Sequence, residues 1–187
     1  MKAKVKIMLL LFFIGFGVTN AQETVVPIEQ KKGLERVPTT TYYFQDVNGV
    51  LNKYLGIWKY ETSTEIFVIT FSLSVHRSTG KNFMDDIVGR FKYIRNGTVI
   101  YDTYNVFNRR DIFGVFFKFP NNTNKLNLQY YEQGVTYKTI YAQVNLEFVP
   151  STTLGGSNTL IWTRNIFQDT PTPPPYQLPR EMVLVKQ

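Results

Sequence analysis

Residues 66–76 read IFVITFSLSVH, and from Ile69 onward apolar and polar side chains alternate. Successive side chains of an extended chain point to opposite faces, so a period of two residues indicates a β-strand with one buried face. The apolar face is expected to carry Phe67, Ile69, Phe71, Leu73 and Val75. The polar face is expected to carry Thr70, Ser72, Ser74 and His76.

The same alternation returns later in the chain, between clusters of turn-forming residues. Its apolar positions are Phe113, Val115, Phe117 and Phe119, then Leu126, Leu128 and Tyr130, then Ile140, Ala142, Val144, Leu146 and Phe148. Asn96-Gly97 separates two further segments, 87–94 and 99–104, and predicts a tight hairpin because both residues tolerate positive φ. Strands are also predicted at 56–61, 159–163 and 182–186, and one short helical turn at 50–55.

Short strands with tight turns and no long helix predict an all-β fold of about eight or nine strands. An antiparallel meander leaves two exposed edges unless it closes, so we predict an up-and-down, lipocalin-like barrel over residues 42–187. Residues 22–41 are polar, lack a period and are predicted to form a flexible arm. An outer-membrane barrel would also show alternation, but the short loops and the Lys186-Gln187 ending favour a barrel outside the membrane.

The first 21 residues have the three parts of a secretory signal peptide. Three lysines precede the apolar run 7–18, and small residues end the segment at Ala21. That run of 12 residues is shorter than the roughly 20 needed by a membrane-spanning helix. We therefore predict cleavage and export, with no transmembrane span in the mature chain.

The composition excludes several classes of function. There is no cysteine, which excludes disulfides and thiolate chemistry. Much of the +7 net charge belongs to the predicted signal peptide, and without its three lysines the charge falls to +4. Since the remaining basic residues form no stripe, we predict no nucleic-acid partner.

No set of catalytic residues stands out. His76 is the only histidine, and a zinc site needs three or four ligands, so no metal or other cofactor is predicted. Asp85 and Asp86 are adjacent, so they would point to opposite faces and form no catalytic pair, and we expect them in a turn between strands. The sequence therefore predicts a protein that is not an enzyme.

Aromatic side chains are abundant and suit either of two roles. They would line a ligand cavity in the barrel, or they would fill its interior, because a barrel of about eight strands is just wide enough for either. The candidates for lining a cavity are Trp58, Phe71, Phe91, Phe117, Tyr130 and Trp162.

Residues 54–60, YLGIWKY, resemble the Gly-x-Trp opening of lipocalin-type barrels. The resemblance implies that a helical turn closes one end of the barrel and that an arginine stacks on the Trp. In this chain it implies barrel-closing roles for Gly56, Trp58 and Arg164. Such a cation–π contact would be worth about 0.5 to 2 kcal/mol.

Residues 51–60, 86–97 and 178–187 together resemble a family of small, exported, uncharacterised proteins from flavobacteria and their relatives in the Bacteroidota. This resemblance implies a domain of unknown function, a signal peptide and a lipocalin-like β domain. It also implies a periplasmic or secreted location in a Gram-negative bacterium. The resemblance implies no known activity and no catalytic residues.

These observations favour an exported binding module that holds a small apolar ligand in the barrel or an envelope protein at its rim. The alternative is a structural or interaction protein of the cell envelope, with a filled core, acting through its loops and the Pro-rich segment 170–175. A hydrolase with carboxyl or tyrosyl groups in the barrel interior is the third, less favoured hypothesis.

Overall fold

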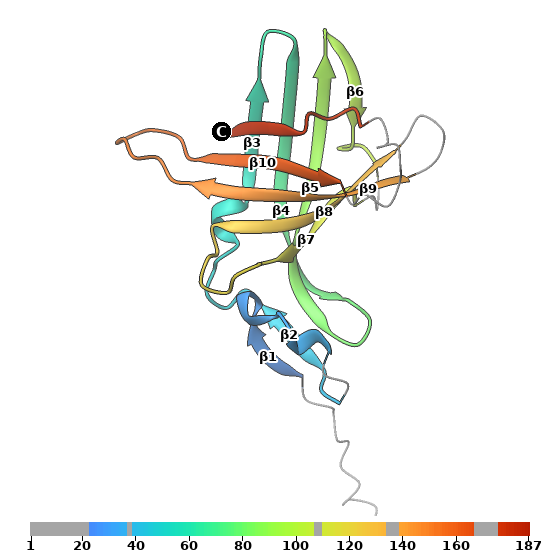
Figure 1. Cartoon of the computed structure of the whole chain (residues 1–187), viewed down its shortest axis with the longest axis vertical. Helices are drawn as coiled ribbons and strands as arrows, with labels where there is room; N and C mark the ends of the chain where they lie inside the picture. Colours follow the sequence, from blue (N-terminus) through green and yellow to red (C-terminus); the bar gives the residue numbers. More distant parts are fainter. Residues whose placement is uncertain (1–22, 37–38, 107–109, 134–138, 167–175) are drawn as a thin grey trace, which may run out of the picture.

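The structure is a computed structural model that describes residues 23–36, 39–106, 110–133, 139–166 and 176–187 (Figure 1). The predicted signal peptide and segment 170–175 lie outside the described residues. The strands are β1 (Thr24–Pro27), β2 (Tyr42–Gln45), β3 (Gly56–Glu61), β4 (Glu65–Ser78), β5 (Phe83–Arg95), β6 (Thr98–Asp102), β7 (Ile112–Phe116), β8 (Lys125–Gln133), β9 (Thr139–Val149), β10 (Thr159–Ile166) and β11 (Glu181–Lys186). Three 3-10 turns are η1 (Ile28–Gln30), η2 (Leu34–Arg36) and η3 (Asn52–Tyr54). No helix among the described residues is long and apolar enough to cross a membrane.

Eight antiparallel strands form a closed barrel, which confirms the predicted fold class. Neighbours in sequence pair from β3 to β5 and from β7 to β11. The ring closes where β11 pairs with β3 and where β5 pairs with β7. In Figure 1 the strands β8–β10 run across β3–β5 at a steep angle, so the inward side chains of the two groups meet in one core.

The Asn96-Gly97 hairpin is confirmed. It joins β5 to β6, and its residues adopt φ values of 49° and 75°. The strand β6 pairs with the Lys92–Arg95 end of β5, whereas β7 pairs with the Ile87–Gly89 part. The ring therefore continues through β7, and β6 extends one end of the wall.

Two of the predicted strand faces are wrong in part. Leu73 and Val75 are exposed, because β3 begins opposite Phe71 and leaves the following part of β4 without that neighbour. In β7 a bulge at Gly114, which has a φ of 103°, shifts the alternation. Ile112 is consequently buried in place of Phe113, and Phe119 is exposed.

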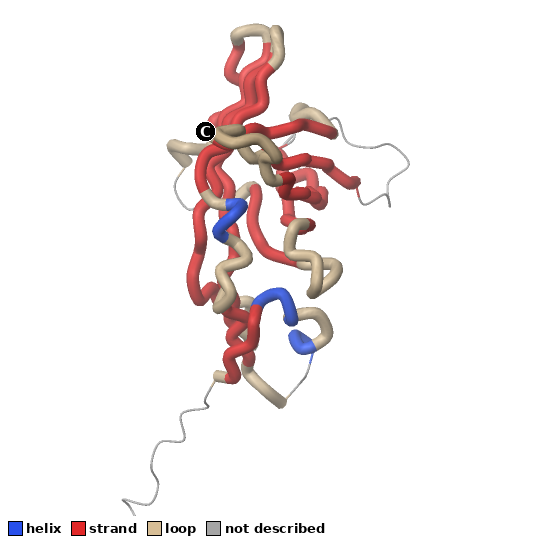
Figure 2. Tube along the Cα trace, turned by 90° about the vertical axis from the view of Figure 1, so that its left-hand side faces the viewer, coloured by secondary structure: helices blue, strands red, loops and turns tan. Residues whose placement is uncertain are grey.

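Residues 24–36, which the sequence predicts within a flexible arm, are docked against the barrel. The strand β1 pairs in parallel with β2, and β2 pairs in parallel with the start of β5. Ile28 is buried in the core cluster. Figure 2 shows these elements together at one end of the molecule. Each is only three or four residues long, which is too short to produce a readable period.

Gly89 lies on the inner face of β5, where the neighbouring strands come close. A Cβ there would lie 2.9 Å from Ile69 Cδ1 and 3.0 Å from Phe71 Cε1. We predict that Gly89→Ala lowers the free energy of unfolding by about 1–3 kcal/mol, because the packed core must shift. Urea unfolding measures this, with the exposed neighbour Arg90→Ala as a control that changes stability by less than about 0.5 kcal/mol. Equal stability of the Gly89→Ala variant and the unchanged protein would contradict the packing described.

Candidate functional site

The six aromatic residues predicted to line a cavity are all buried in the barrel. They are Trp58, Phe71, Phe91, Phe117, Tyr130 and Trp162. Several of them pack ring against ring: the centroids of Phe91 and Tyr130 are 6.4 Å apart, and those of Tyr130 and Trp162 are 6.2 Å apart. The ring centroid of Phe67 lies 5.5 Å from that of Trp162 and 5.4 Å from that of Phe91. These contacts favour the filling role, since the rings occupy the interior that a ligand would need.

One end of the barrel is closed around Trp58. Its indole Nε1 donates a hydrogen bond of 2.7 Å to the carbonyl oxygen of Tyr54 in η3, and Gly56 supplies the φ of 102° that starts β3. The cation over the Trp58 ring is Lys186, whose Nζ lies 4.8 Å from the ring centroid and also donates to the Leu55 carbonyl. The predicted helical turn is present at this end.

The predicted stacking of Arg164 on Trp58 is wrong. Lys186 pairs with Trp58, and Val185 pairs with Thr159 at the start of β10. Arg164 lies five positions further along β10, so the strand carries it toward the other end of the barrel. There its guanidinium lies 3.9 Å from the centroid of the Tyr176 ring.

A buried carboxylate, Glu132, organises that other end. It accepts hydrogen bonds from the Tyr130 hydroxyl at 2.7 Å, the Tyr101 hydroxyl at 3.0 Å and the Gln177 backbone N–H. Arg164 Nη1 lies 3.9 Å from it. Burial, then the nearby carboxylate, raises the pKa of Tyr130 well above its ordinary value, so this hydroxyl stays a donor. Through its hydrogen bond with Gln177 N, Glu132 anchors the chain at 177 to the barrel.

Asp85 and Asp86 lie within β5 and are buried, so their predicted position in a turn is wrong. Asp85 accepts hydrogen bonds from the Tyr43 hydroxyl at 2.6 Å, Asp46 N at 2.9 Å and His76 N at 3.0 Å. Asp86 instead forms an ion pair with Arg77. The two carboxylates thus have separate partners and form no catalytic pair. Asp85 ties β2 and the loop after it to the β4–β5 hairpin.

His76 lies at the bulge of β4 with a φ of 51°. Its ring stacks on Phe83 at 4.3 Å, and its Nε2 lies 2.9 Å from Glu23 Oε2. Within the described ranges, no group of three or more His, Asp or Glu side chains is placed to hold a metal ion.

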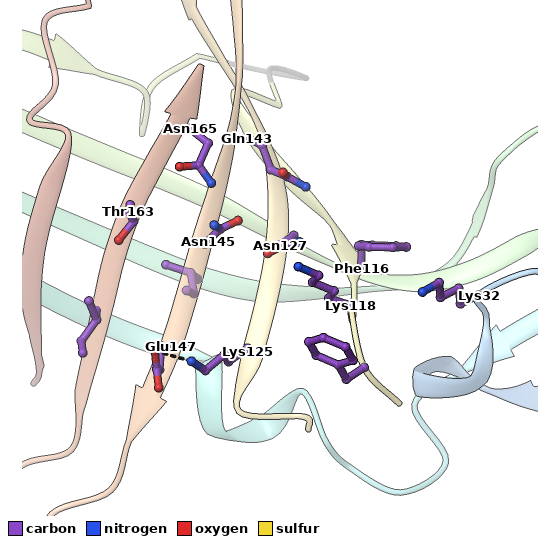
Figure 3. A pocket seen from close by; sticks show the side chains of 13 residues that line it. Lys32, Phe116, Lys118, Lys125, Asn127, Gln143, Asn145, Glu147, Thr163 and Asn165 are labelled. Atoms are coloured by element: carbon purple, nitrogen blue, oxygen red, sulfur yellow. Dashed lines mark ion pairs between the residues drawn. The ribbon is translucent and has the colours of Figure 1, made fainter. Parts of the chain in front are cut away.

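A hollow with a volume of about 750 Å³ lies on the outer face of the barrel, over β7–β10 (Figure 3). Its floor includes the exposed Ile161 and a set of mostly polar side chains, namely Asn127, Gln143, Asn145, Glu147, Thr163 and Asn165. A smaller hollow of about 350 Å³ adjoins it, and Phe116, Asn127 and Gln143 line both. We call the two together the outer groove.

Strand register brings the floor residues into rows. Asn145 pairs with Asn127 on one side and with Thr163 on the other, and Gln143 pairs with Asn165. Paired residues share a face, so the amides form a compact grid on neighbouring strands. The sequence places these residues on the polar face of each strand. The sequence feature that could have indicated this grid is the repetition of asparagine and glutamine on that face.

The walls of the outer groove come from segments distant in sequence. Phe116 and Phe119 are exposed at the end of β7 and in the turn after it, and Lys118 lies between them. Lys32 reaches the same wall from the turn between η1 and η2. In Figure 3 the side chains of Phe116, Lys118 and Lys32 lie to one side of the amide floor. None of the six predicted ligand-lining residues lines either hollow.

A family model described as "Family of unknown function (DUF6705)" matches residues 1–187. No curated protein and no solved structure matches the chain. The family match confirms the part of the resemblance that concerns a domain of unknown function. The flavobacterial host, the export and the lipocalin-like opening stay predictions.

We predict that Glu132→Leu destabilises the protein by about 3–5 kcal/mol, because it leaves Arg164 charged and unpaired inside the barrel. The double variant Glu132→Leu with Arg164→Met should recover only part of this loss, since both charges are then removed but the donors Tyr101, Tyr130 and Gln177 N–H still lack their acceptor. Chemical denaturation of the three proteins measures the difference. A cost of the single variant below about 1 kcal/mol would contradict a buried, coupled pair.

The buried tyrosines predict a loss of stability at alkaline pH. Burial, and then a hydrogen bond to Asp85, raises the pKa of Tyr43 from 10.0 to about 12, and burial with Glu65 does the same for Tyr93. In the unfolded chain these tyrosines release their protons at a lower pH than in the folded protein. Their contribution to the free energy of unfolding is therefore fully present below pH 10 and is lost between pH 10 and 12. Unfolding in urea across this range should show the fall. A smaller slope is expected for Tyr93→Phe, and an unchanged slope would contradict the assignment.

Proposed function

The chain belongs to the family of unknown function DUF6705, and we propose that it is a non-catalytic binding module whose outer groove holds a hydroxyl-rich ligand, namely a saccharide chain. The observation that carries this proposal is the grid of amide side chains on the groove floor. We further propose that the chain is exported to the periplasm or secreted, on the basis of the signal-peptide pattern in residues 1–21.

Amide side chains suit hydroxyl-rich ligands. Each asparagine or glutamine offers one oxygen acceptor and two N–H donors, and a sugar hydroxyl both donates and accepts. The Oδ1 atom of Asn145 is screened from solvent and receives no hydrogen bond from the described residues. A buried acceptor without a donor is costly, so rotation of this amide toward a ligand hydroxyl in the groove would be favoured.

Exposed aromatic rings beside the amide grid add an apolar surface to the proposed saccharide site. Phe116 is 36% exposed and Phe119 is 55% exposed. Large apolar side chains at the rim of a polar hollow are typical of binding surfaces, and a flat ring can cover the apolar C–H face of a sugar. The floor and the wall therefore offer hydrogen bonds and an apolar contact to the same ligand.

The barrel interior is a poorer candidate. Its aromatic side chains contact one another, and none of the six predicted lining residues borders either hollow. A small apolar ligand inside would have to displace several packed rings. The filled barrel instead provides a rigid support for the outer groove, in agreement with the second of the hypotheses drawn from the sequence.

The groove has the composition of a binding site rather than of a hydrolytic one. Glycoside hydrolysis uses two carboxyl groups on either side of the bond that is cleaved. Among the lining residues Glu147 supplies the single carboxylate, and it forms an ion pair of 3.0 Å with Lys125. We therefore propose binding without cleavage.

Native gel electrophoresis through gels that contain a polysaccharide tests this function. The gels would contain polygalacturonate, alginate, dextran or starch, and the protein would span residues 22–187. We expect at least one polymer to retard it, and we expect Asn145→Leu to weaken that binding about tenfold through lost hydrogen bonds. Asn105→Leu removes an exposed amide outside the groove and should change nothing.

A complementary assay adds an environment-sensitive apolar dye to the same protein, and no uptake is expected. The proposal fails if no polysaccharide retards the protein, or if Asn145→Leu is retarded as strongly as the unchanged chain. If the dye binds and changes the fluorescence of the buried Trp162, the barrel interior would be favoured as the binding site instead.

A further inference from the structure

We infer that the ligand of the outer groove is an anionic saccharide chain, one that carries carboxylate groups as a uronic-acid polymer does. This inference rests on the proposed function and adds the charge and the extended form of the ligand. It is carried by the basic residues along one wall of the groove, together with the neutral amide floor.

The lining of the groove is strongly basic. Its charged residues are Lys31, Lys32, Arg77, Lys118 and Lys125, against the single acid Glu147. Lys125 is paired with Glu147, and Arg77 is paired with the buried Asp86. Lys31, Lys32 and Lys118 are thus the cations that face an incoming ligand. Three lysines with few acids among them create a positive potential that favours a negative group.

One of these lysines, Lys31, is partly buried, and a partner of opposite charge would compensate for its lost hydration. Burial lowers the pKa of the Lys31 ammonium, and Glu35 opposes that effect only in part. The Nζ of Lys31 lies 3.9 Å from the sulfur of Met84, a weak acceptor. A carboxylate from a ligand would replace this weak contact by a charge-assisted hydrogen bond, which is roughly twice as strong as a neutral one.

The groove has the shape for a chain rather than a single sugar. The larger hollow reaches Glu147 and Ile161, and the smaller one reaches Arg77 and Met84. The two adjoin at Phe116, Asn127 and Gln143, which line both. Amides occupy β8–β10, and the lysines stand on the wall toward β7 and the N-terminal segment (Figure 3). A polymer that lies along the groove would place hydroxyls on the amides and acidic groups on the lysines.

Two other anionic polymers fit less well. Phosphodiester groups only accept hydrogen bonds, so the backbone of a nucleic acid would leave the amide oxygens of the floor without donors. An acidic peptide in extended form binds best by adding a strand to a sheet edge. The groove lies on a sheet face, where the backbone of β8 and β9 is already paired on both sides. A uronic-acid chain offers both hydroxyl donors and carboxylates.

The test compares polygalacturonate oligomers with the same oligomers fully methyl-esterified, by titration calorimetry with residues 22–187. The two probes share their sugar rings and differ in charge. We expect the charged oligomer to bind about tenfold more tightly at low salt and to lose that advantage as salt is raised. The double variant Lys32→Gln with Lys118→Gln should remove the difference between the two probes. Asn145→Leu should weaken the binding of both.

A matched control, Lys59→Gln with Lys92→Gln, removes the same charge outside the groove and should leave the difference intact. Equal binding of both oligomers, still sensitive to Asn145→Leu, would overturn the anionic ligand and leave the proposed function standing. Binding of neither oligomer, with tight binding of a single-stranded oligonucleotide, would also overturn it. If neither probe binds and none of the gel polymers does, the proposed function fails as well.

Discussion

The pairing that closes the barrel is the constraint on which the rest of the structure depends. The strand β11 returns to β3, β5 pairs with β7, and eight strands therefore enclose one interior. A ring of about that size is just wide enough for its own side chains. In this chain the enclosed side chains are large aromatics such as Trp58 and Trp162, which leave the interior packed. The closed, packed barrel therefore supports the proposal that recognition uses its outer surface.

Much of the fold was predictable because it follows from local chemistry. The period of two residues identifies β4, β8 and β9, and the positive φ of Asn96 and Gly97 fixes one hairpin. The errors arise where burial depends on distant partners. Leu73 alternates correctly but is exposed because β3 ends its pairing with β4 at Phe71, and the bulge at Gly114 shifts the alternation so that Ile112 is buried in place of Phe113. Bulges and strand ends are tertiary features.

The candidate site was less predictable than the fold, for a related reason. The inward position of Glu132 follows from the phase of Tyr130, but its partners Gln177 and Arg164 come from other parts of the chain. Likewise, the asparagines of β8 and β9 read only as a polar face. They form the floor of a groove because the turn after β7 and the segment around Lys32 lie beside them and form its wall. The register between β11 and β3 places Lys186, and not Arg164, over Trp58. The alternation of residues within a single strand does not determine that register.

The most direct measurement is a ¹H–¹⁵N nuclear magnetic resonance titration of the processed chain with polygalacturonate oligomers. The chain has two tryptophans, so the indole N–H signals of Trp58 and Trp162 report on the barrel interior, and the side-chain amides of Asn127, Gln143 and Asn145 report on the groove. Recognition on the outer face predicts that the amide signals shift while both indole signals stay in place. Shifts of the indole signals with unchanged groove amides would contradict it.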